Sequence, residues 1–452
     1  MNEAWNAGTG VTRRTALGGA FAAGVCLGAE GLFAAPAAGE AQMPGRPWAK
    51  DPRYRLPLLA FGCADRFPQK RGHGKNSVDY EFAAELVDYA MKHGVNWFDT
   101  GYVYHAGESE KFLGKTLVKY PRESYILSDK MPAWKCDRKE DIARIFEEQL
   151  ARCHTEYFDF YLLHSIGSKP VYEKVYKQWG GLAYLREQKA KGRIRHLGLS
   201  FHGKSDFLEE VLTENPDLEV CMVMQNAMEH TWNQDSRKFP EICVRHGVSV
   251  LVMEPLAGGR AAGLRGKSME PLLKVHPEDT PAKWGLRYAA SLPGVVCLMS
   301  GMNKLAHLQE NIQTLGAAFK PLDEAEKKAY DEAIGVYMKY KSIPCTGCRY
   351  CMPCPYGLPI PEIFAWYSEW AQSGRLPADE GPNDSQDLRR RFLASYYNKF
   401  PSKTRADRCL GCKKCLVSCP QWTFRIPVEM GRIADLVART ENVYVQKGGV
   451  IR

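Results

Sequence analysis

The chain has 452 residues, of which 45% are hydrophobic and 25% are charged, enough apolar side chains for a globular protein of more than one domain. Its net charge of +9 is spread along the chain, and short basic runs such as 389–391 are typical of a solvated helix face, which disfavours a nucleic-acid-binding protein. After the N-terminus no apolar stretch reaches the length of about 18 to 20 residues that a membrane-spanning helix needs, so the mature chain is expected to have none.

Residues 1–42 differ in composition from the rest of the chain. Arg13 and Arg14 precede a weakly apolar segment of Ala, Gly and Leu, which ends in the small residues of 35–37. This pattern resembles a twin-arginine export signal, whose route carries proteins that have folded with their cofactors in place. It predicts a protein that is exported to the periplasm. The alternative is a disordered basic tail.

Short β-type runs alternate with helix-length segments from residue 53 to residue 318. Each run is apolar and is bounded by charged residues, Gly or Pro. The eight runs are LPLLAFG, VNWFDTG, SYILSDKM, FDFYLLHS, IRHLGLSF, LEVCMVMQNA, VSVLVMEP and VVCLMSG. Residues 138–153 predict a helix that packs on the sheet through one face, formed by Ile142, Ile145, Phe146, Leu150 and Cys153.

Eight βα units in roughly 265 residues predict a (β/α)₈ barrel. A doubly wound parallel sheet is the alternative, but no G-x-G-x-x-G fingerprint follows a strand. The fold class is therefore α/β, with the barrel at 53–318 and a second, mainly helical domain at 320–452.

Four ionisable residues come at the ends of the predicted strands, where a barrel carries its chemistry. Asp99 closes NWFD, Tyr104 follows it in the next loop, Lys130 closes ILSDK and His164 closes FYLLH. A phenol gives up its proton more readily beside an ammonium, and a carboxylate can hold that ammonium in place. A neutral imidazole can hydrogen-bond a carbonyl oxygen. The set suits protonation of an oxygen while its carbon receives hydride.

At these residues the chain resembles the aldo-keto reductases. FDTGYVYHAGESEKFLGKTL, SDKMP and DFYLLH are similar to the three signature regions of that family, whose catalytic tetrad is Asp, Tyr, Lys and His. The resemblance assigns these roles to Asp99, Tyr104, Lys130 and His164, with Tyr104 as the general acid. Tyr102 is a rival in the same motif. The resemblance implies a carbonyl or alcohol as the small-molecule substrate.

The resemblance also implies a nicotinamide cofactor, NADP or NAD. Ser200 and Gln225 match residues that hold the carboxamide in the family, but Phe201 stands where Asn is usual and Met253 stands where an aromatic residue stacks on the ring. The pyrophosphate-contacting turn of the family is matched by Leu256, Gly258 and Gly259. Its adenine-contacting pair is matched by Glu310 and Asn311.

His307 occupies the position where the family commonly carries a basic clamp for the 2′-phosphate of NADP, with Lys304 nearby. An imidazole cannot make the bidentate bonds of an arginine, so the choice between NADP and NAD stays open.

The C-terminal region carries eight of the 15 cysteines in two groups. The first group is Cys345, Cys348, Cys351 and Cys354. The second group is Cys409, Cys412, Cys415 and Cys419. The second group, followed by Pro420, fits the ferredoxin run C-x₂-C-x₂-C-x₃-C-P, and the first departs from it by one residue. This favours two 4Fe–4S clusters over zinc or disulfides.

In two-cluster ferredoxins the fourth cysteine of each run serves the other cluster. That implies one set of Cys345, Cys348, Cys351 and Cys419. It implies a second set of Cys409, Cys412, Cys415 and Cys354. Between the groups, PEIFAWYSEW and SQDLRRRFLASYYNKF predict helices that wrap the clusters or dock on the barrel. The chain thus resembles the branch of the aldo-keto reductases with a ferredoxin-type domain.

Four other cysteines lie in strand or helix patterns and are predicted to be buried apolar residues: Cys153, Cys221, Cys243 and Cys297.

Nicotinamide passes two electrons as hydride, whereas a cluster passes them singly, so a flavin would be a suitable converter, but no flavin motif is visible. Three hypotheses follow. The first is a reductase or dehydrogenase whose clusters exchange electrons with a redox partner protein. The second is an electron-transfer module whose barrel is a docking scaffold with weak or no nicotinamide binding. In the third, the clusters are structural and the barrel works alone.

Overall fold

The computed structural model describes residues 41–64, 67–68, 77–340, 342–347, 349, 351–419 and 425–450. The predicted export signal lies outside the described residues up to position 40, and so do Cys348 and Pro420. No helix within the described ranges is both long enough and apolar enough to cross a bilayer.

Eight parallel strands close into a barrel in the order β10-β3-β4-β5-β6-β7-β8-β9, which confirms the predicted (β/α)₈ architecture and excludes the doubly wound sheet. The strands are β3 Leu59–Gly62, β4 Trp97–Asp99, β5 Ile126–Met131, β6 Phe158–Ile166, β7 Ile194–Phe201, β8 Val220–Met224, β9 Ser249–Met253 and β10 Val295–Ser300. Seven lie within the predicted runs and β6 extends one residue beyond its run, because parallel strands that are covered on both faces need near-continuous apolar sequence.

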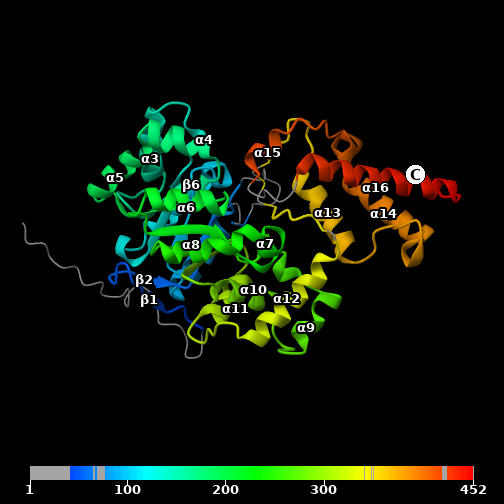
Figure 1. The fold of residues 1–452 in the computed structure, drawn as a ribbon, viewed down its shortest axis with the longest axis horizontal. Helices are drawn as coiled ribbons and strands as arrows, with labels where there is room; N and C mark the ends of the chain where they lie inside the picture. Colours follow the sequence, from blue (N-terminus) through cyan, green and yellow to red (C-terminus); the bar gives the residue numbers. More distant parts are fainter. Residues whose placement is uncertain are drawn as a thin grey trace, which may run out of the picture.

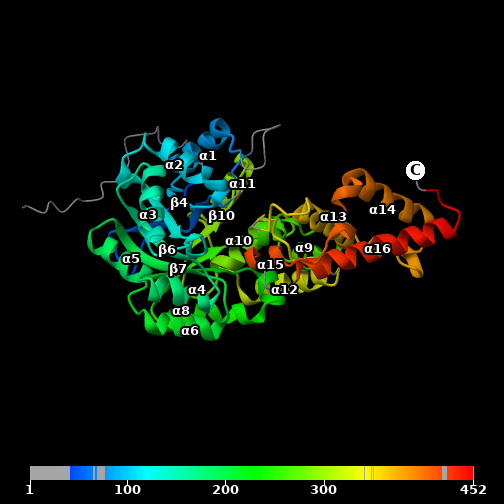
Figure 2. The same ribbon diagram turned by 90° about the horizontal axis from the view of Figure 1, so that it is seen from above.

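Helices surround the barrel on its outer side (Figures 1 and 2). They are α1 Tyr80–Lys92, α2 Glu108–Leu117, α3 Glu140–Arg152, α4 Lys169–Val171, α5 Gly181–Ala190, α6 Ser205–Glu214, α7 Ala227–Trp232, α8 Phe239–Arg245, α9 Glu270–Leu273, α10 Pro281–Ala290 and α11 Leu305–Leu315. The predicted helix at 138–153 is α3, and the apolar residues of its predicted face are buried. The four cysteines predicted as apolar residues are buried as well.

A short antiparallel hairpin, β1 Gly45–Pro47 with β2 Arg55–Pro57, closes one end of the barrel. Trp48, which follows β1, packs against Phe160 with ring centroids 5.4 Å apart and donates a hydrogen bond of 2.9 Å to Ser249 Oγ at the start of β9. Since strands begin at this end, the hairpin seals the amino end of the barrel. The carboxyl end is left as the mouth.

The helix α12 (Glu324–Met338) packs on the barrel helices. Arg287 in α10 makes a bidentate ion pair of 2.7 and 2.8 Å with Glu326 in α12. By packing, the barrel body therefore extends past residue 318, where the sequence pattern suggested its end.

The C-terminal region has a hydrophobic core of its own, which begins at Ile343. It is built from α13 Ile360–Gln372, α14 Gln386–Lys399, α15 Lys414–Ser418 and α16 Ile426–Gln446. The predicted helices of this region correspond to α13 and α14, which contribute to this core. Figure 2 shows the region as a lobe beside the barrel, with α15 facing the barrel and α16 running away from it.

Candidate active site

Four ionisable side chains meet at the carboxyl ends of three neighbouring strands. Asp99 is the last residue of β4, Lys130 lies near the end of β5, His164 lies in β6, and Tyr104 begins the turn that follows β4. All four line one cavity of about 650 Å³. The structure therefore brings together the side chains that were predicted as a catalytic group.

Lys130 is a buried cation that is held by a buried carboxylate. Its Nζ lies 2.7 Å from Asp99 Oδ2 and donates a hydrogen bond of 2.6 Å to the carbonyl oxygen of Thr100. Ser128 Oγ donates to the other carboxylate oxygen of Asp99 at 2.7 Å. Lys130 is fully buried and Asp99 is 3% exposed. Because a buried charge needs such partners, Asp99 and the Thr100 carbonyl hold the ammonium of Lys130 in place at the wall of the cavity.

Tyr104 presents its ring to this cation. Lys130 Nζ lies 5.0 Å from the ring centroid. Gly101 makes room for the ring, because a Cβ at that position would lie 3.1 Å from Tyr104 Cζ. The rival Tyr102 does not line the cavity, and its hydroxyl donates to Glu148 Oε2 at 2.7 Å. Of the two tyrosines, Tyr104 is therefore the one that lines the cavity beside the ammonium of Lys130, where a phenolate would be stabilised.

His164 faces Tyr104 edge-on, with ring centroids 5.7 Å apart, and packs against Trp134 at 4.8 Å. Burial lowers its pKa well below the usual value, and the charges on Lys130 and His202 lower it further. The imidazole is therefore neutral at pH 7. Its Nδ1 is buried and has no hydrogen-bond partner in the described part of the chain.

This arrangement can protonate an oxygen at the cavity wall. A carbonyl oxygen between Tyr104 and His164 would accept a hydrogen bond from the neutral imidazole and a proton from the phenol. Lys130 would stabilise the phenolate that is left behind. A hydride delivered to the carbonyl carbon completes the reduction, and a nicotinamide is the cofactor that supplies it when bound.

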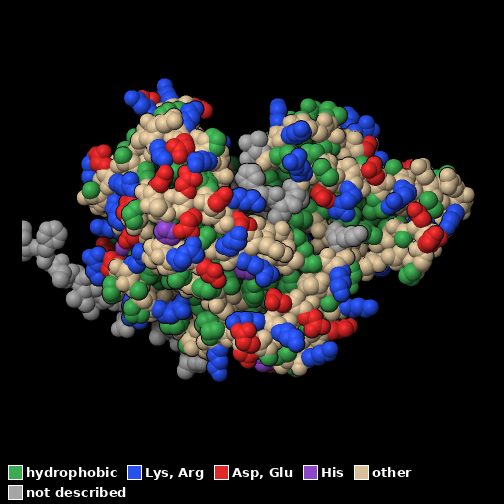
Figure 3. All heavy atoms as spheres, in the orientation of Figure 1, with side chains coloured by type: hydrophobic (Ala, Val, Ile, Leu, Met, Phe, Trp, Pro, Cys, Tyr) green, Lys and Arg blue, Asp and Glu red, His purple; other side chains and the backbone are tan. Residues whose placement is uncertain are grey.

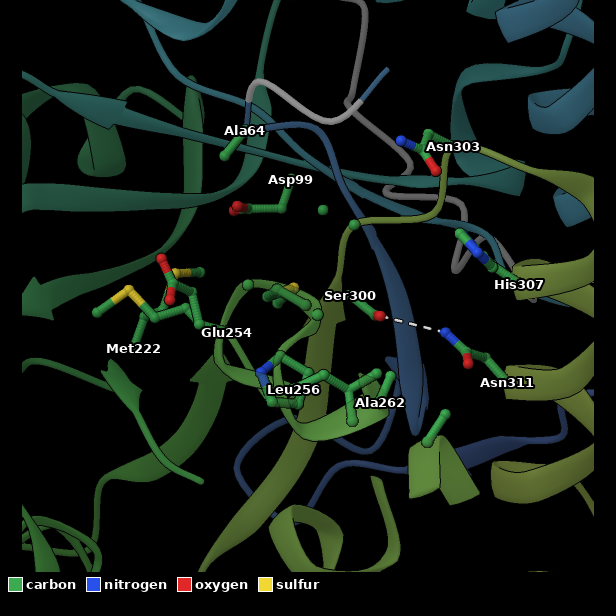
Figure 4. Close-up of a pocket in the computed structure, with 18 of the residues that line it drawn as sticks. Ala64, Asp99, Met222, Glu254, Leu256, Ala262, Ser300, Asn303, His307 and Asn311 are labelled. Atoms are coloured by element: carbon green, nitrogen blue, oxygen red, sulfur yellow. Dashed lines mark hydrogen bonds between the residues drawn. The ribbon is translucent and has the colours of Figure 1, made fainter. Parts of the chain in front are cut away.

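Most of the residues predicted to contact the nicotinamide cofactor line the cavity. Those that line the cavity are Ser200, Leu256, Gly258, Gly259, Glu310 and Asn311. Asn311 Nδ2 donates to Ser300 Oγ at 3.2 Å, and Glu310 accepts a hydrogen bond from Thr280. Figure 4 shows Asn311, His307 and Asn303 on one side of the cavity and Glu254 and Met222 on the other.

Gln225 is the predicted cofactor residue that the structure does not bring to the cavity. It is fully buried; its Nε2 donates to the carbonyl oxygen of Ser236 at 2.9 Å and its Oε1 lies 2.6 Å from His230 Nε2. Phe201 is also turned away, packed against neighbouring aromatic rings. Of the predicted carboxamide contacts only Ser200 faces the cavity.

His307 lines the cavity near its nucleotide end. Burial lowers the pKa of its imidazole, and the nearby charge of Lys304 lowers it further while Glu310 raises it. The lowered pKa favours the neutral imidazole of His307. It therefore offers no fixed positive charge to a phosphate.

Several lining residues were not predicted from the sequence, among them Met222, Glu254, His202 and Asn303. Glu254 follows β9 directly and His202 follows β7 directly. Their position at strand ends is the same signal that identified Asp99. Glu254 also has a left-handed backbone, with φ of 51°.

The cysteines of the C-terminal region lie close together across the two groups. Burial, together with the neighbouring thiols of Cys345, Cys419 and Cys415, raises the pKa of the Cys351 thiol to about 12. Burial likewise raises the pKa of the Cys415 thiol, as do the thiols of Cys409, Cys412 and Cys354.

A small cavity is lined by four of these residues, Cys354, Cys409, Cys412 and Cys415. Within the described ranges no three or more His, Cys, Asp and Glu side chains converge as ligands of a single metal ion.

The first cysteine group touches the rim of the barrel cavity. Thr346 Oγ1 donates to Glu254 Oε1 at 3.1 Å. Gly258, which has φ of 67°, lies against the backbone of Thr346, where a Cβ would come within 2.3 Å of the carbonyl oxygen. The loop that carries Cys345 is therefore seated on the loop predicted to contact the cofactor.

Known proteins that are similar to this chain include aldo-keto reductases. The sequence model of the Aldo/keto reductase family matches residues 66–334, more than half of the chain. "Probable aldo-keto reductase 1" of Glycine max is 24% identical over 320 residues, which are 63% of this chain and 87% of that protein. The NADH-specific methylglyoxal reductase of Escherichia coli K12 is 22% identical over 302 residues, 57% of this chain and 90% of that protein.

Among solved structures, aldo-keto reductase AKR11C1 from Bacillus halodurans is 22% identical, with a TM-score of 0.49, and the match covers 65% of this chain and 96% of that chain. The match of the family model and the residues that meet in the cavity agree, and the chain belongs to the aldo/keto reductase family of NAD(P)-dependent oxidoreductases.

Proposed function

We propose that the protein reduces a small carbonyl compound with a nicotinamide cofactor, and that Tyr104 supplies the proton. The observation that carries this proposal is the buried Lys130–Asp99 pair, 2.7 Å apart, beside the Tyr104 ring. A fixed ammonium beside the phenol stabilises the phenolate and so favours transfer of its proton. His164, held neutral, orients the carbonyl oxygen.

NADH suits the cavity better than NADPH. The position expected to clamp the 2′-phosphate is His307, whose lowered pKa favours the neutral imidazole. A 2′-phosphate would therefore lack a charge-assisted partner there. Titration of the purified protein with each dinucleotide tests this, and tighter binding of NADPH would contradict it.

The substrate is proposed only by class, as a small aldehyde or ketone. A relative of known name reduces methylglyoxal with NADH, which makes methylglyoxal a suitable first member of a substrate panel. Oxidation of NADH, followed at each carbonyl of the panel, tests the activity. If no carbonyl supports NADH oxidation and no alcohol supports the reverse reaction, the proposal is wrong.

The C-terminal region is proposed to hold two 4Fe–4S clusters. One would use Cys345, Cys348, Cys351 and Cys419. The other would use Cys409, Cys412, Cys415 and Cys354. The neighbourhood of the described thiols supports this grouping, since Cys351 lies near Cys345 and Cys419, and the second set shares one cavity. Thiolates are the donors that such clusters require.

An absorption spectrum and iron analysis of anaerobically purified protein test the clusters, with about eight irons expected per chain. The grouping is tested by the electron paramagnetic resonance of the reduced protein. Cys419→Ser is expected to alter the same signal as Cys351→Ser, and Cys354→Ser the same signal as Cys415→Ser. Pairing of Cys419 with Cys415 instead would contradict the proposed sets.

A second function, electron transfer with the barrel as a docking scaffold, is favoured by one observation. Gln225 is already bonded to Ser236 and His230, which leaves the nicotinamide carboxamide with fewer partners than the family provides. Micromolar binding of either dinucleotide would contradict this alternative, because it rests on weak nicotinamide binding.

Export by the twin-arginine route is part of the proposal and rests on the sequence around Arg13 and Arg14. Cell fractionation tests it. Replacement of both arginines by lysine is expected to retain the protein in the cytoplasm.

A further inference from the structure

The two cysteine groups differ in what surrounds them. Cys345 is adjacent to Thr346, which is buried against the barrel at Glu254 and Gly258. Cys412, by contrast, is exposed to solvent. The first group is thus an inner group next to the barrel cavity, and the second is an outer group at the protein surface.

Exposed apolar side chains surround the outer group. Leu410 lies between two of its cysteines and is 70% exposed, and Tyr356 is 46% exposed. Both line the small cavity that holds the outer cysteines. Val428, 62% exposed, follows Pro427 of the same cavity. Large apolar side chains that cluster at one exposed place mark a surface that binds another protein.

The rim of this apolar patch is basic. The described residues close to this patch in the sequence are mostly basic: Lys403, Arg405, Arg408, Lys413, Lys414 and Arg425, with Asp407 as the acid, and Lys413 lines the same small cavity. Asp407 lies 3.4 Å from Arg408, so it is neutralised within the rim. Glu429, the next acid along the chain, pairs with Arg432 at 2.5 Å. Figure 3 shows Lys and Arg side chains among hydrophobic ones around α15.

We propose that this face, the outer cysteine group with its apolar patch and basic rim, is the docking site of an acidic one-electron carrier protein. The inference rests on the proposed iron–sulfur clusters. An apolar centre within a ring of one charge is the form that a transient electron-transfer interface takes, because the charges steer the encounter and the apolar contact brings the centres close. The positive rim requires a partner with a negative one.

In each encounter one electron leaves the reduced carrier and enters the protein at the outer group. The carrier is oxidised and the protein is reduced by one electron, and no bond or proton moves. The inner group, whose loop touches the barrel rim through Thr346, is the next electron acceptor, since described cysteines of both groups pack against the same hydrophobic core. The contact of Thr346 with Glu254 then joins the inner group to the cavity rim.

The test measures association of the holoprotein with two carriers of opposite charge. The probes are an acidic plant-type 2Fe–2S ferredoxin and a basic cytochrome c, both at low ionic strength. We expect the ferredoxin to bind and the cytochrome not to bind. We also expect the association rate to fall steeply as salt is added, because steering by charge is screened.

A charge-reversal variant locates the face. The docking variant carries Lys403→Glu, Arg408→Glu and Lys414→Glu. A matched control with the same change of net charge carries substitutions of three exposed lysines on the barrel side, Lys50→Glu, Lys274→Glu and Lys320→Glu. The docking variant is expected to lose at least about tenfold in association rate with ferredoxin, and the control less than about threefold.

The outcomes separate the two proposals. Iron–sulfur absorption with equal association rates in both variants would overturn the docking face and leave the clusters intact. Tighter binding of the cytochrome would overturn it as well. A protein without iron–sulfur absorption would overturn the proposed clusters and this inference with them. A docking variant with full iron content and a selectively reduced rate supports the assignment.

Discussion

Thr346 donates a hydrogen bond of 3.1 Å to Glu254, and this bond joins the cysteine-bearing region to the wall of the barrel cavity. The two residues are 92 positions apart in the chain. Glu254 follows β9 and lines the cavity, while Thr346 follows the first cysteine of the inner group. The two parts of the protein therefore meet at the loop predicted to bind the cofactor. A displacement of the cysteine loop would therefore reach the cavity wall through this contact, and the reverse holds too.

Replacement of Gly258 by alanine tests that contact. A Cβ at Gly258 would lie 2.3 Å from the carbonyl oxygen of Thr346, so the cysteine loop must move away. Gly259→Ala is the matched control, because Gly259 also has a positive φ, of 90°, but nothing within 4 Å of its Cβ position. Both variants carry the backbone strain of about 1 kcal/mol, and only the first displaces the loop.

We expect Gly258→Ala to make the cysteine region more susceptible to proteolysis than Gly259→Ala does, with the barrel resistant in both. The free energy of unfolding of the cysteine region, followed by its iron–sulfur absorption in denaturant, is expected to fall further in Gly258→Ala. Indistinguishable cleavage and unfolding of the two variants would mean that the loop is not held at this point.

Tyr104→Phe removes the proposed acid and keeps the ring over Lys130. We expect kcat for carbonyl reduction to fall by about 10² to 10⁴, the range typical of general acid catalysis, with dinucleotide affinity unchanged. Tyr102→Phe, from the same motif, is expected to retain activity, because its hydroxyl bonds Glu148 outside the cavity. Steady-state kinetics of both variants measure the loss of kcat in each. Equal losses would contradict the assignment of Tyr104.

The barrel could be predicted from the sequence because its signals are local. Eight apolar runs, each cut by charge, Gly or Pro, correspond to the eight strands. Three-residue strands carry no detectable period, so the hairpin of β1 and β2 gave no such signal. Packing that joins distant segments, such as α12 against the barrel, also lies beyond local pattern.

The site was predictable where strand ends fix a side chain and less so elsewhere. Asp99 and Lys130 project from rigid strands, so their convergence follows from topology. Gln225 lies at a matching sequence position, but Ser236 and His230 compete for its amide and hold it away from the cavity. A sequence motif identifies which residue occupies a position, but the neighbouring hydrogen-bond partners determine the orientation of its side chain.

Lys130→Met is expected to abolish activity and to destabilise the fold. The substitution leaves Asp99 as an unpaired carboxylate that is 3% exposed, and breaking a buried ion pair in this way costs about 3 to 5 kcal/mol. The double variant Asp99→Asn with Lys130→Met removes both charges, so most of the stability should return while the activity stays lost. Urea denaturation and kinetics of the three proteins measure this. Recovery of activity in the double variant would contradict a catalytic role for the ammonium.

The stability of the barrel should depend on pH through Glu229 in α7. The pKa of its carboxyl is raised to about 7, mainly by burial; a hydrogen bond from Asn233 opposes this rise and the nearby Glu254 adds to it. In the unfolded chain a glutamate has a pKa of about 4.3. The folded state therefore holds the proton more tightly, so this contribution to stability is complete below the unfolded pKa and is lost as the pH rises to about 7.

Glu229→Gln cannot ionise, and it keeps the shape of the protonated side chain. Its stability advantage over the wild-type protein is expected to grow by roughly 2 to 3 kcal/mol between pH 5 and pH 8, since one pKa unit corresponds to about 1.4 kcal/mol. Urea denaturation at the two pH values measures the difference. Glu241→Gln, at an exposed position of α8, is the control and should show no such growth. An advantage of Glu229→Gln that shrinks with rising pH would contradict the raised pKa, because it would mean that the ionised carboxylate is the form the folded protein prefers.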